Sequence, residues 1–149
     1  MTLSSGVKGY TTIHAGSARQ ALTRLRFICQ LADTSNELPM SALSALVSEA
    51  IDLVVHCSRA GGKVRVHEVV AVEELQVGPD AMQFTVTELF ARPTLDEPLE
   101  WTGNLPVRAA RALSEAGYDV RRLLDPDADR RPAPTRPRVV TGIGRPREV

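Results

Sequence analysis

The sequence predicts a mixed α/β domain, and three stretches carry that prediction. Apolar residues recur at helical spacing through residues 18–32, a near-continuous apolar run fills 51–57, and apolar and polar residues alternate through 82–87. The first pattern is typical of an amphipathic helix, the second of a buried strand and the third of a half-exposed strand. At 149 residues the chain has room for one domain with a modest core.

Composition narrows the class of protein further. Hydrophobic residues make up 43% and charged residues 24%, as in a globular protein. The 18 basic and 18 acidic residues give a formal net charge of zero, so no long-range field attracts nucleic acid or an anionic membrane. We therefore predict no specific nucleic acid partner.

Cys29 and Cys57 lie inside apolar patterns and are expected to be small buried hydrophobes rather than a disulfide pair. No apolar run approaches the ~20 residues that a membrane span needs, and residues 1–5 lack the pattern of a signal peptide. These features predict a reducing, cytoplasmic compartment.

The first elements surround a histidine. Residues 10–14 favour a strand through their threonines and isoleucine, and this predicted strand ends at His14. Ser17 is placed as the N-cap of the following helix, and Gln20 completes a capping-box pattern. A polar side chain at a strand end beside a helix N-terminus is where open α/β sheets bind ligands, although the same pattern also fits a well-capped turn.

The remaining elements follow in order. Pro39 suits the first position of a second helix, and 51–57 is expected to be a strand covered on both faces. We expect turns at Gly61-Gly62 and 78–80, strands within 64–75 and 82–87, a connector at 93–98, a helix over 106–117 and a further turn or helix over 118–124. The three strands after the second helix are expected to form a meander.

From Asp125 onward, proline and arginine recur without apolar periodicity, which predicts disorder. Gly62-Lys63 is followed by Val64, where a phosphate loop needs serine or threonine, so this dipeptide is interpreted as a hairpin turn. The predicted domain organisation is a main unit over 1–92, a helical extension over 93–124 and a tail over 125–149.

The stretch Thr-Thr-Ile-His-Ala-Gly-Ser at 11–17, followed by a helix that contains Arg24-Leu25, resembles the histidine box of the type II/type IV secretion ATPases. It is most similar to the branch that powers tight-adherence pili and conjugation machines. The resemblance continues through 51–56, 69–75 and 103–124, and so spans about residues 4–124.

This resemblance implies a fold and a function. The fold would be the C-terminal part of a RecA-like P-loop NTPase core, with an antiparallel strand meander and a small helical end. The function would be that of the C-terminal portion of a hexameric traffic ATPase, which couples ATP hydrolysis to pilus assembly or to export of protein or DNA. An alternative is a non-catalytic interaction module that binds or regulates a full-length secretion ATPase.

Cofactors and partners follow from the same resemblance. ATP and Mg²⁺ would be the cofactors, but the phosphate loop and two acidic motifs that precede the histidine box in the family do not occur in these 149 residues. We therefore predict no ATPase activity for the chain alone. Expected partners are further copies of the chain, the rest of a split ATPase, or inner-membrane secretion and pilus platform proteins. The expected location is the cytoplasm or the inner face of the cell membrane.

The resemblance also nominates site residues. It implies that His14 contacts the γ-phosphate and senses the nucleotide; the alternative is a structural histidine. Arg19 and Arg24 would contact phosphate or a neighbouring subunit, unless they are solvated helix residues. Thr12, Ser17 and His56 complete the nominated nucleotide contacts, although His56 equally fits a core histidine bonded to a backbone carbonyl. His14, His56 and His67 show no metal-ligand spacing, so no metal site is predicted.

Overall fold

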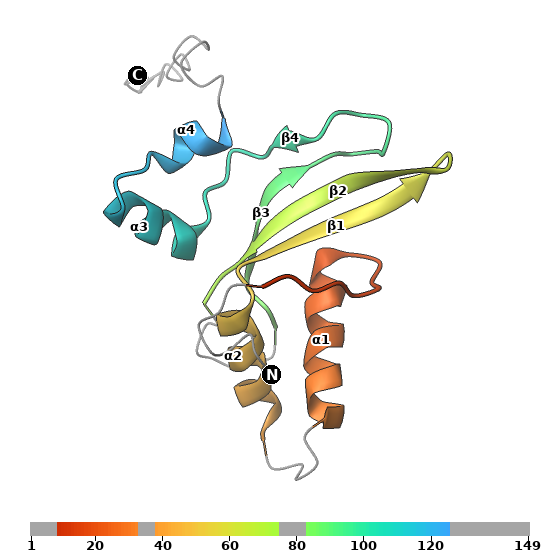
Figure 1. Ribbon diagram of the computed structural model, residues 1–149, viewed down its shortest axis with the longest axis vertical. Coiled ribbons are helices and arrows are strands. Elements are labelled where there is room, and N and C mark those ends of the chain that lie inside the picture. Colours follow the sequence, from red (N-terminus) through yellow and green to blue (C-terminus); the bar gives the residue numbers. More distant parts are fainter. Residues whose placement is uncertain (1–8, 33–37, 75–82, 126–149) are drawn as a thin grey trace, which may run out of the picture.

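The computed structural model describes residues 9–32, 38–74 and 83–125, and its centre is a four-stranded antiparallel sheet in the order β1-β2-β3-β4 (Figure 1). The elements in chain order are α1 (Ala18–Ala32), α2 (Met40–Ala50), β1 (Leu53–Ala60), β2 (Lys63–Val72), β3 (Val86–Ala91), β4 (Glu100–Trp101), α3 (Val107–Glu115) and α4 (Val120–Leu124). The predicted mixed α/β class and strand meander are confirmed. The RecA-like core stays a prediction.

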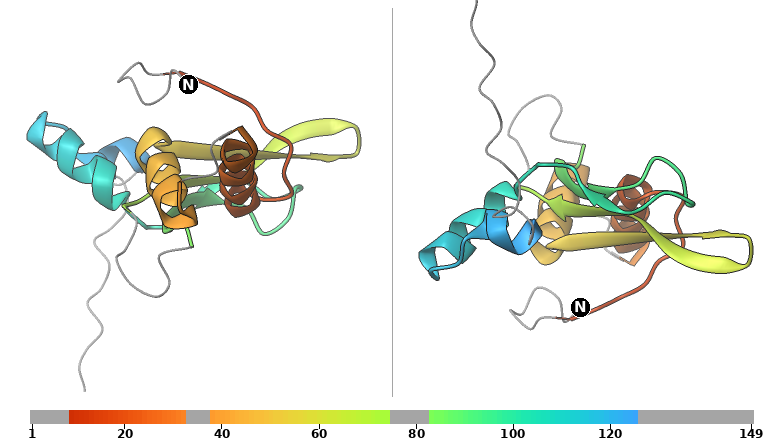
Figure 2. Two further views of the ribbon diagram at one scale, coloured as in Figure 1. Left: turned by 90° about the horizontal axis from the view of Figure 1, so that it is seen from below. Right: turned by 90° about the horizontal axis from the view of Figure 1, so that it is seen from above.

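Helices α1 and α2 pack together on one side of the sheet (Figures 1 and 2). The core lies between them and the strands. One cluster of buried side chains there consists of Leu22, Val47, Val72 and Phe84. Arg26 joins the two helices across this core, because its Nη1 donates to Ser44 Oγ at 3.0 Å while its guanidinium lies 5.4 Å from the centre of the Phe84 ring. Arg26 therefore ties α1 both to α2 and to the segment before β3.

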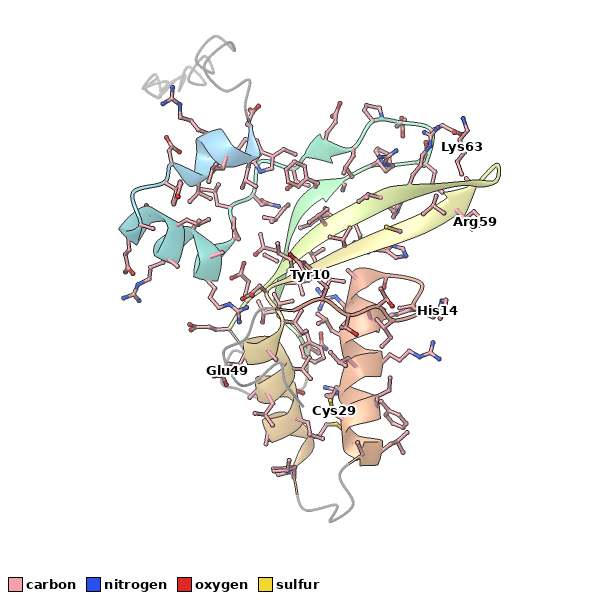
Figure 3. All side chains as sticks on the ribbon, viewed as in Figure 1. Tyr10, His14, Cys29, Glu49, Arg59 and Lys63 are labelled. Carbon is pink, nitrogen blue, oxygen red and sulfur yellow. The ribbon has the colours of Figure 1, made fainter. Side chains whose placement is uncertain are left out.

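The turn predicted at Gly61-Gly62 is confirmed as the tip of the β1–β2 hairpin. Both glycines have positive φ, 55° and 77°, which glycine adopts without the strain of a Cβ atom. The hairpin extends well past α1 (Figure 1), and Arg59 and Lys63 lie near its tip (Figure 3).

Three strand predictions are corrected. Residues 10–14 are not a strand, because no neighbouring strand in the described part of the chain pairs with them. The 51–57 run is not covered on both faces: Leu53 and Val55 in β1 are each 54% exposed, and Cys57 is exposed rather than buried. β3 begins at Val86, later than the predicted start at residue 82.

Other predictions fall partly outside the described residues. The predicted turn at 78–80 and all but the first residue of the predicted 125–149 tail lie there. The second helix is present, with Pro39 as its N-cap rather than its first helical residue. The third helix and the following short helix are also confirmed, and Gly117 ends the third with φ of 85°.

A buried glutamate attaches α3 to the sheet. Glu73, directly after β2, is 5% exposed, and its carboxylate accepts hydrogen bonds from the backbone N–H groups of Val107 and Arg108 at 3.0 and 2.8 Å. Arg108 in turn donates to Ile51 O at 2.8 Å and to Asp52 Oδ1 at 3.0 Å, after the end of α2. The carboxylate therefore satisfies the first N–H groups of α3, and the arginine satisfies carbonyls at the end of α2.

Candidate functional site

Helix α1 begins with the cap that the sequence predicts. The Gln20 N–H donates to Ser17 Oγ at 3.2 Å, and the Gly16 N–H donates to Gln20 Oε1 at 3.0 Å. These two bonds resemble a capping box, in which the side chain at the third helical position accepts from the N-cap N–H. Here Gln20 accepts instead from the N–H of Gly16, one residue before the N-cap. They fix the direction in which the preceding segment enters the helix.

His14 lies on this entering segment and its side chain is exposed. Figure 3 shows it at the outer margin of the molecule, pointing away from α1. Its backbone carbonyl accepts a hydrogen bond from Arg24 Nη1 at 2.9 Å, which holds the segment against the helix. Thr12, two residues earlier, is exposed as well. The imidazole is therefore available to a ligand, while the backbone beneath it is anchored.

The two nominated arginines have different contacts. Arg19 Nη1 donates to Phe84 O at 2.7 Å and so ties α1 to the segment before β3. Arg24 ties α1 to His14. A guanidinium has five N–H donors, so each arginine keeps donors for a further partner after these bonds.

A shallow, open groove runs along the exposed side of α1 from its first turn. It is lined by Ala15, Gly16, Ser17, Arg19, Gln20, Thr23, Arg24 and Phe27. Three of the nominated residues, Ser17, Arg19 and Arg24, therefore line one surface, and His14 directly precedes it. The groove combines two cationic side chains with two hydroxyls, which is chemistry suited to an anionic ligand.

His56 lies apart from this groove. Its side chain is 12% exposed and faces the helix side of β1, with Nδ1 3.3 Å from Glu68 Oε1. That separation is within ion-pair range, but the angles do not make a hydrogen bond, and no other polar partner reaches this nitrogen in the described part of the chain. No hydrogen bond or ion pair joins His56 to His14 in that part either.

Glu68 is the residue that the sequence analysis missed. Its Oε1 accepts the Ala18 N–H at 2.8 Å, so the same oxygen contacts both the first turn of α1 and the His56 ring. The available signal was an acidic residue directly before the apolar run 69–72. His67, beside it, is half-buried, with its ring 5.8 Å from the His56 ring in an edge-to-face arrangement.

Two further observations concern metal ions and membranes. Within the described ranges, no three histidine, cysteine, aspartate or glutamate side chains gather closely enough to hold a metal ion. No helix in the described residues is both long and apolar enough to span a bilayer.

Comparisons with known proteins point to one kind of system. No protein-family profile matches the chain. Over 55 residues, the chain is 44% identical to the type IV secretion system protein PtlH of Bordetella pertussis, and equally to the PtlH homologs of Bordetella parapertussis and Bordetella bronchiseptica. The match covers 37% of this chain and only 16% of each relative. The chain is thus similar, over part of its length, to a type IV secretion system protein.

Proposed function

We propose that this chain is the part of a type IV secretion ATPase that carries the histidine-box side of the nucleotide site. One observation carries the proposal: an exposed His14 directly precedes a groove lined by Arg19 and Arg24 at the first turns of α1. The partial similarity to PtlH supports the same kind of system. In this proposal His14 meets the γ-phosphate, and Arg24 holds His14 in place through its carbonyl.

The backbone of α1 contributes less than a free helix N-terminus would. Such a terminus can bind an anion through its unpaired N–H groups. Here Glu68 accepts the Ala18 N–H and Ser17 accepts the Gln20 N–H. A phosphate at this end of α1 would compete with the Glu68 carboxylate and the Ser17 hydroxyl for these N–H groups. In this proposal the phosphate is therefore attracted mainly by the side chains of His14, Arg19 and Arg24.

Hydrolysis needs groups from outside these 149 residues. Phosphoryl transfer depends on positioning and electrostatic stabilisation, and the sequence contains neither a phosphate loop nor acidic motifs that would hold Mg²⁺. Each charge-assisted hydrogen bond contributes roughly 1.5–3 kcal/mol, and about 1.4 kcal/mol changes affinity tenfold. Three absent bonds therefore weaken nucleotide binding by several orders of magnitude.

The experiment measures phosphate release by the purified chain, alone and mixed with the phosphate-loop portion of a secretion ATPase. We expect release only from the mixture, and His14→Ala should lower it by about tenfold or more, the equivalent of one lost polar contact. Tyr118→Ala is the matched control, because Tyr118 is 56% exposed and lies beyond α3. Release from the chain alone, or full release by the His14→Ala mixture, would contradict the proposal.

A second candidate is an interaction module that binds a full-length secretion ATPase without contributing to catalysis. In the described part of the chain, β1 is an edge strand of the sheet, and this supports the second candidate because an unpaired strand edge is a ready site for another chain. If the chain binds such an ATPase and His14→Ala leaves hydrolysis unchanged, this second function is the correct one.

A further inference from the structure

A short chain of contacts connects β2 to His14. Glu68, on β2, accepts the N–H of Ala18, the first residue of α1, at 2.8 Å. Two residues before Ala18, the Gly16 N–H donates to Gln20 Oε1 at 3.0 Å, which holds the entering segment against the same turn. The backbone atom that Glu68 holds is thus only four residues from His14. The position of the histidine-box segment therefore depends on a carboxylate of the sheet.

The Glu68 contact differs from the other contacts of this region. Arg24 donates to the His14 carbonyl at 2.9 Å, but Arg24 belongs to α1 itself, so this bond cannot fix α1 on the sheet. Arg19 donates to Phe84 O at 2.7 Å, and Phe84 lies in the segment before β3 rather than in a strand. Glu68 is a residue of β2 and accepts from a backbone atom of α1. Among these three bonds, the Glu68 bond is the one that ties the first turn of α1 directly to a strand.

The carboxylate of Glu68 is itself enclosed. Its side chain is 19% exposed, and His56 Nδ1 lies 3.3 Å from the same oxygen that accepts the Ala18 N–H. The His56 ring in turn meets the His67 ring edge to face, with 5.8 Å between the ring centres. Ala18 is only 2% exposed. The carboxylate therefore has few positions open to it, and the helix start that it holds is fixed with it.

We infer that Glu68 is a positioning residue of the candidate nucleotide site, which sets where His14 stands relative to the sheet. The inference rests on the proposed function, because His14 needs a fixed place only if it meets a phosphate. The groups that complete the site come from outside these 149 residues, so the place of His14 on this domain sets its distance to them. A displacement of about 1 Å can lower the rate of a reaction by roughly 100-fold. Glu68 acts through Ala18 and touches no reacting atom itself.

This role predicts an effect on kcat rather than on KM. In the mixture with a phosphate-loop polypeptide, the phosphate loop supplies most of the nucleotide affinity, whereas His14 meets the phosphate that is transferred. A misplaced His14 therefore weakens a contact made during the transfer and changes binding of the whole nucleotide little. We expect Glu68→Ala to lower kcat by about fivefold to tenfold and to leave KM within about twofold of its original value.

Two further substitutions at Glu68 separate the contact from the charge. Glu68→Gln keeps an oxygen that can accept the Ala18 N–H, so kcat should stay within about twofold of that of the unsubstituted chain. Glu68→Asp keeps the charge but is one methylene shorter, so its oxygen falls short of the Ala18 N–H and kcat should fall as in Glu68→Ala. Glu68→Asp also carries the test if Glu68→Ala does not fold. A Glu68→Gln variant as slow as Glu68→Ala would contradict the inference.

Glu73 offers the matched control. It lies directly after β2, and its carboxylate accepts the first N–H groups of α3 at 3.0 and 2.8 Å, as Glu68 accepts that of α1. α3 lies on the far side of α2 from α1 (Figures 1 and 2). With both variants shown by circular dichroism to be folded, Glu73→Ala should therefore leave kcat unchanged. Equal losses of kcat in Glu73→Ala and Glu68→Ala would show a general structural effect and overturn the inference.

A double substitution tests whether Glu68 acts through His14. If it does, losing the carboxylate has no further effect once the imidazole is gone. The chain with both His14→Ala and Glu68→Ala should then release phosphate at the rate of His14→Ala alone. A rate lowered by the product of the two single effects would mean that Glu68 acts elsewhere, against the inference.

The inference and the proposed function fail in different ways. If His14→Ala leaves phosphate release by the mixture unchanged, the proposed function fails and this inference falls with it. If His14→Ala lowers release while Glu68→Ala and Glu68→Asp do not, the proposed function stands and the inference alone is overturned.

Discussion

The carboxylate of Glu68 and the backbone N–H of Ala18 are joined by a hydrogen bond of 2.8 Å across 50 residues of sequence. Through this bond, β2 holds the first turn of α1, the helix along which the candidate groove runs. A carboxylate at a helix N-terminus is favoured by both the unpaired N–H groups and the helix dipole. The same oxygen lies 3.3 Å from His56 Nδ1, so the sheet, the helix and this histidine meet at one atom.

Glu68→Ala should lower the free energy of unfolding by about 1–2 kcal/mol, because a charge-assisted hydrogen bond to the helix is lost. Urea unfolding followed by circular dichroism measures this difference. Glu88→Ala is the control, since Glu88 lies on β3 and its side chain is exposed. Equal losses for the two variants would mean that the Ala18 contact contributes nothing to stability.

Glu73→Ala should release α3 and α4 from the sheet. The variant leaves the Val107 and Arg108 N–H groups without their acceptor, at an expected cost of about 2 kcal/mol or more. Hydrogen exchange should therefore become faster in 107–124 while exchange in α1 stays slow. Glu74→Ala, at the exposed neighbouring position, should leave both regions unchanged.

The sequence predicted best the elements whose signals are local. α1 combined a capping pattern with helical periodicity, and both are present in the structure. The hairpin turn was predicted from two adjacent glycines, and both have positive φ in the structure. Groove residues Ser17, Arg19 and Arg24 were all nominated by the family resemblance, and they lie close together because they belong to the cap and first two turns of one helix.

The failures concern contacts between distant segments. A strand needs a neighbour, so a β-favouring run at 10–14 is extended but unpaired. The apolar run at 51–57 gave no sign that one face of β1 is open. The roles of Glu68 and Glu73 depend on N–H groups 50 and 34 residues away, which no local pattern reveals.

The two cysteines should differ in their reactivity. Burial raises the pKa of the Cys29 thiol, so a smaller fraction of it is the reactive thiolate at pH 8, whereas Cys57 is exposed. Iodoacetamide should therefore modify Cys57 first, as peptide mass spectrometry can show. A Cys57→Ser variant isolates the slower Cys29 reaction, and faster modification of Cys29 would contradict its packing against the core.

The raised Cys29 pKa also predicts how stability depends on pH. The thiolate is disfavoured in the folded state, so the contribution of this group is fully present below the pKa of the unfolded thiol and is lost as pH rises through the folded pKa. In urea titrations, the unsubstituted chain should lose stability in this alkaline range relative to Cys29→Ala. Parallel curves for the two proteins would show that the thiol has the same pKa in both states.

Ser17 separates helix capping from anion binding. Ser17→Ala should cost about 1 kcal/mol of stability, because the Gln20 N–H loses its acceptor. Ser17→Asp keeps an acceptor and adds a charge that the helix N-terminus favours, so it should fold as stably as the unsubstituted chain.

The carboxylate of Ser17→Asp would nevertheless repel a phosphate in the groove beside Arg19 and Arg24. In the mixture with a phosphate-loop polypeptide, Ser17→Asp should therefore weaken nucleotide binding. Ser41→Asp, which adds the same charge at an exposed position in the first turn of α2, should not. If Ser17→Asp is stable and binds nucleotide normally, the phosphate does not approach the first turn of α1, and the histidine-box proposal loses its geometric basis.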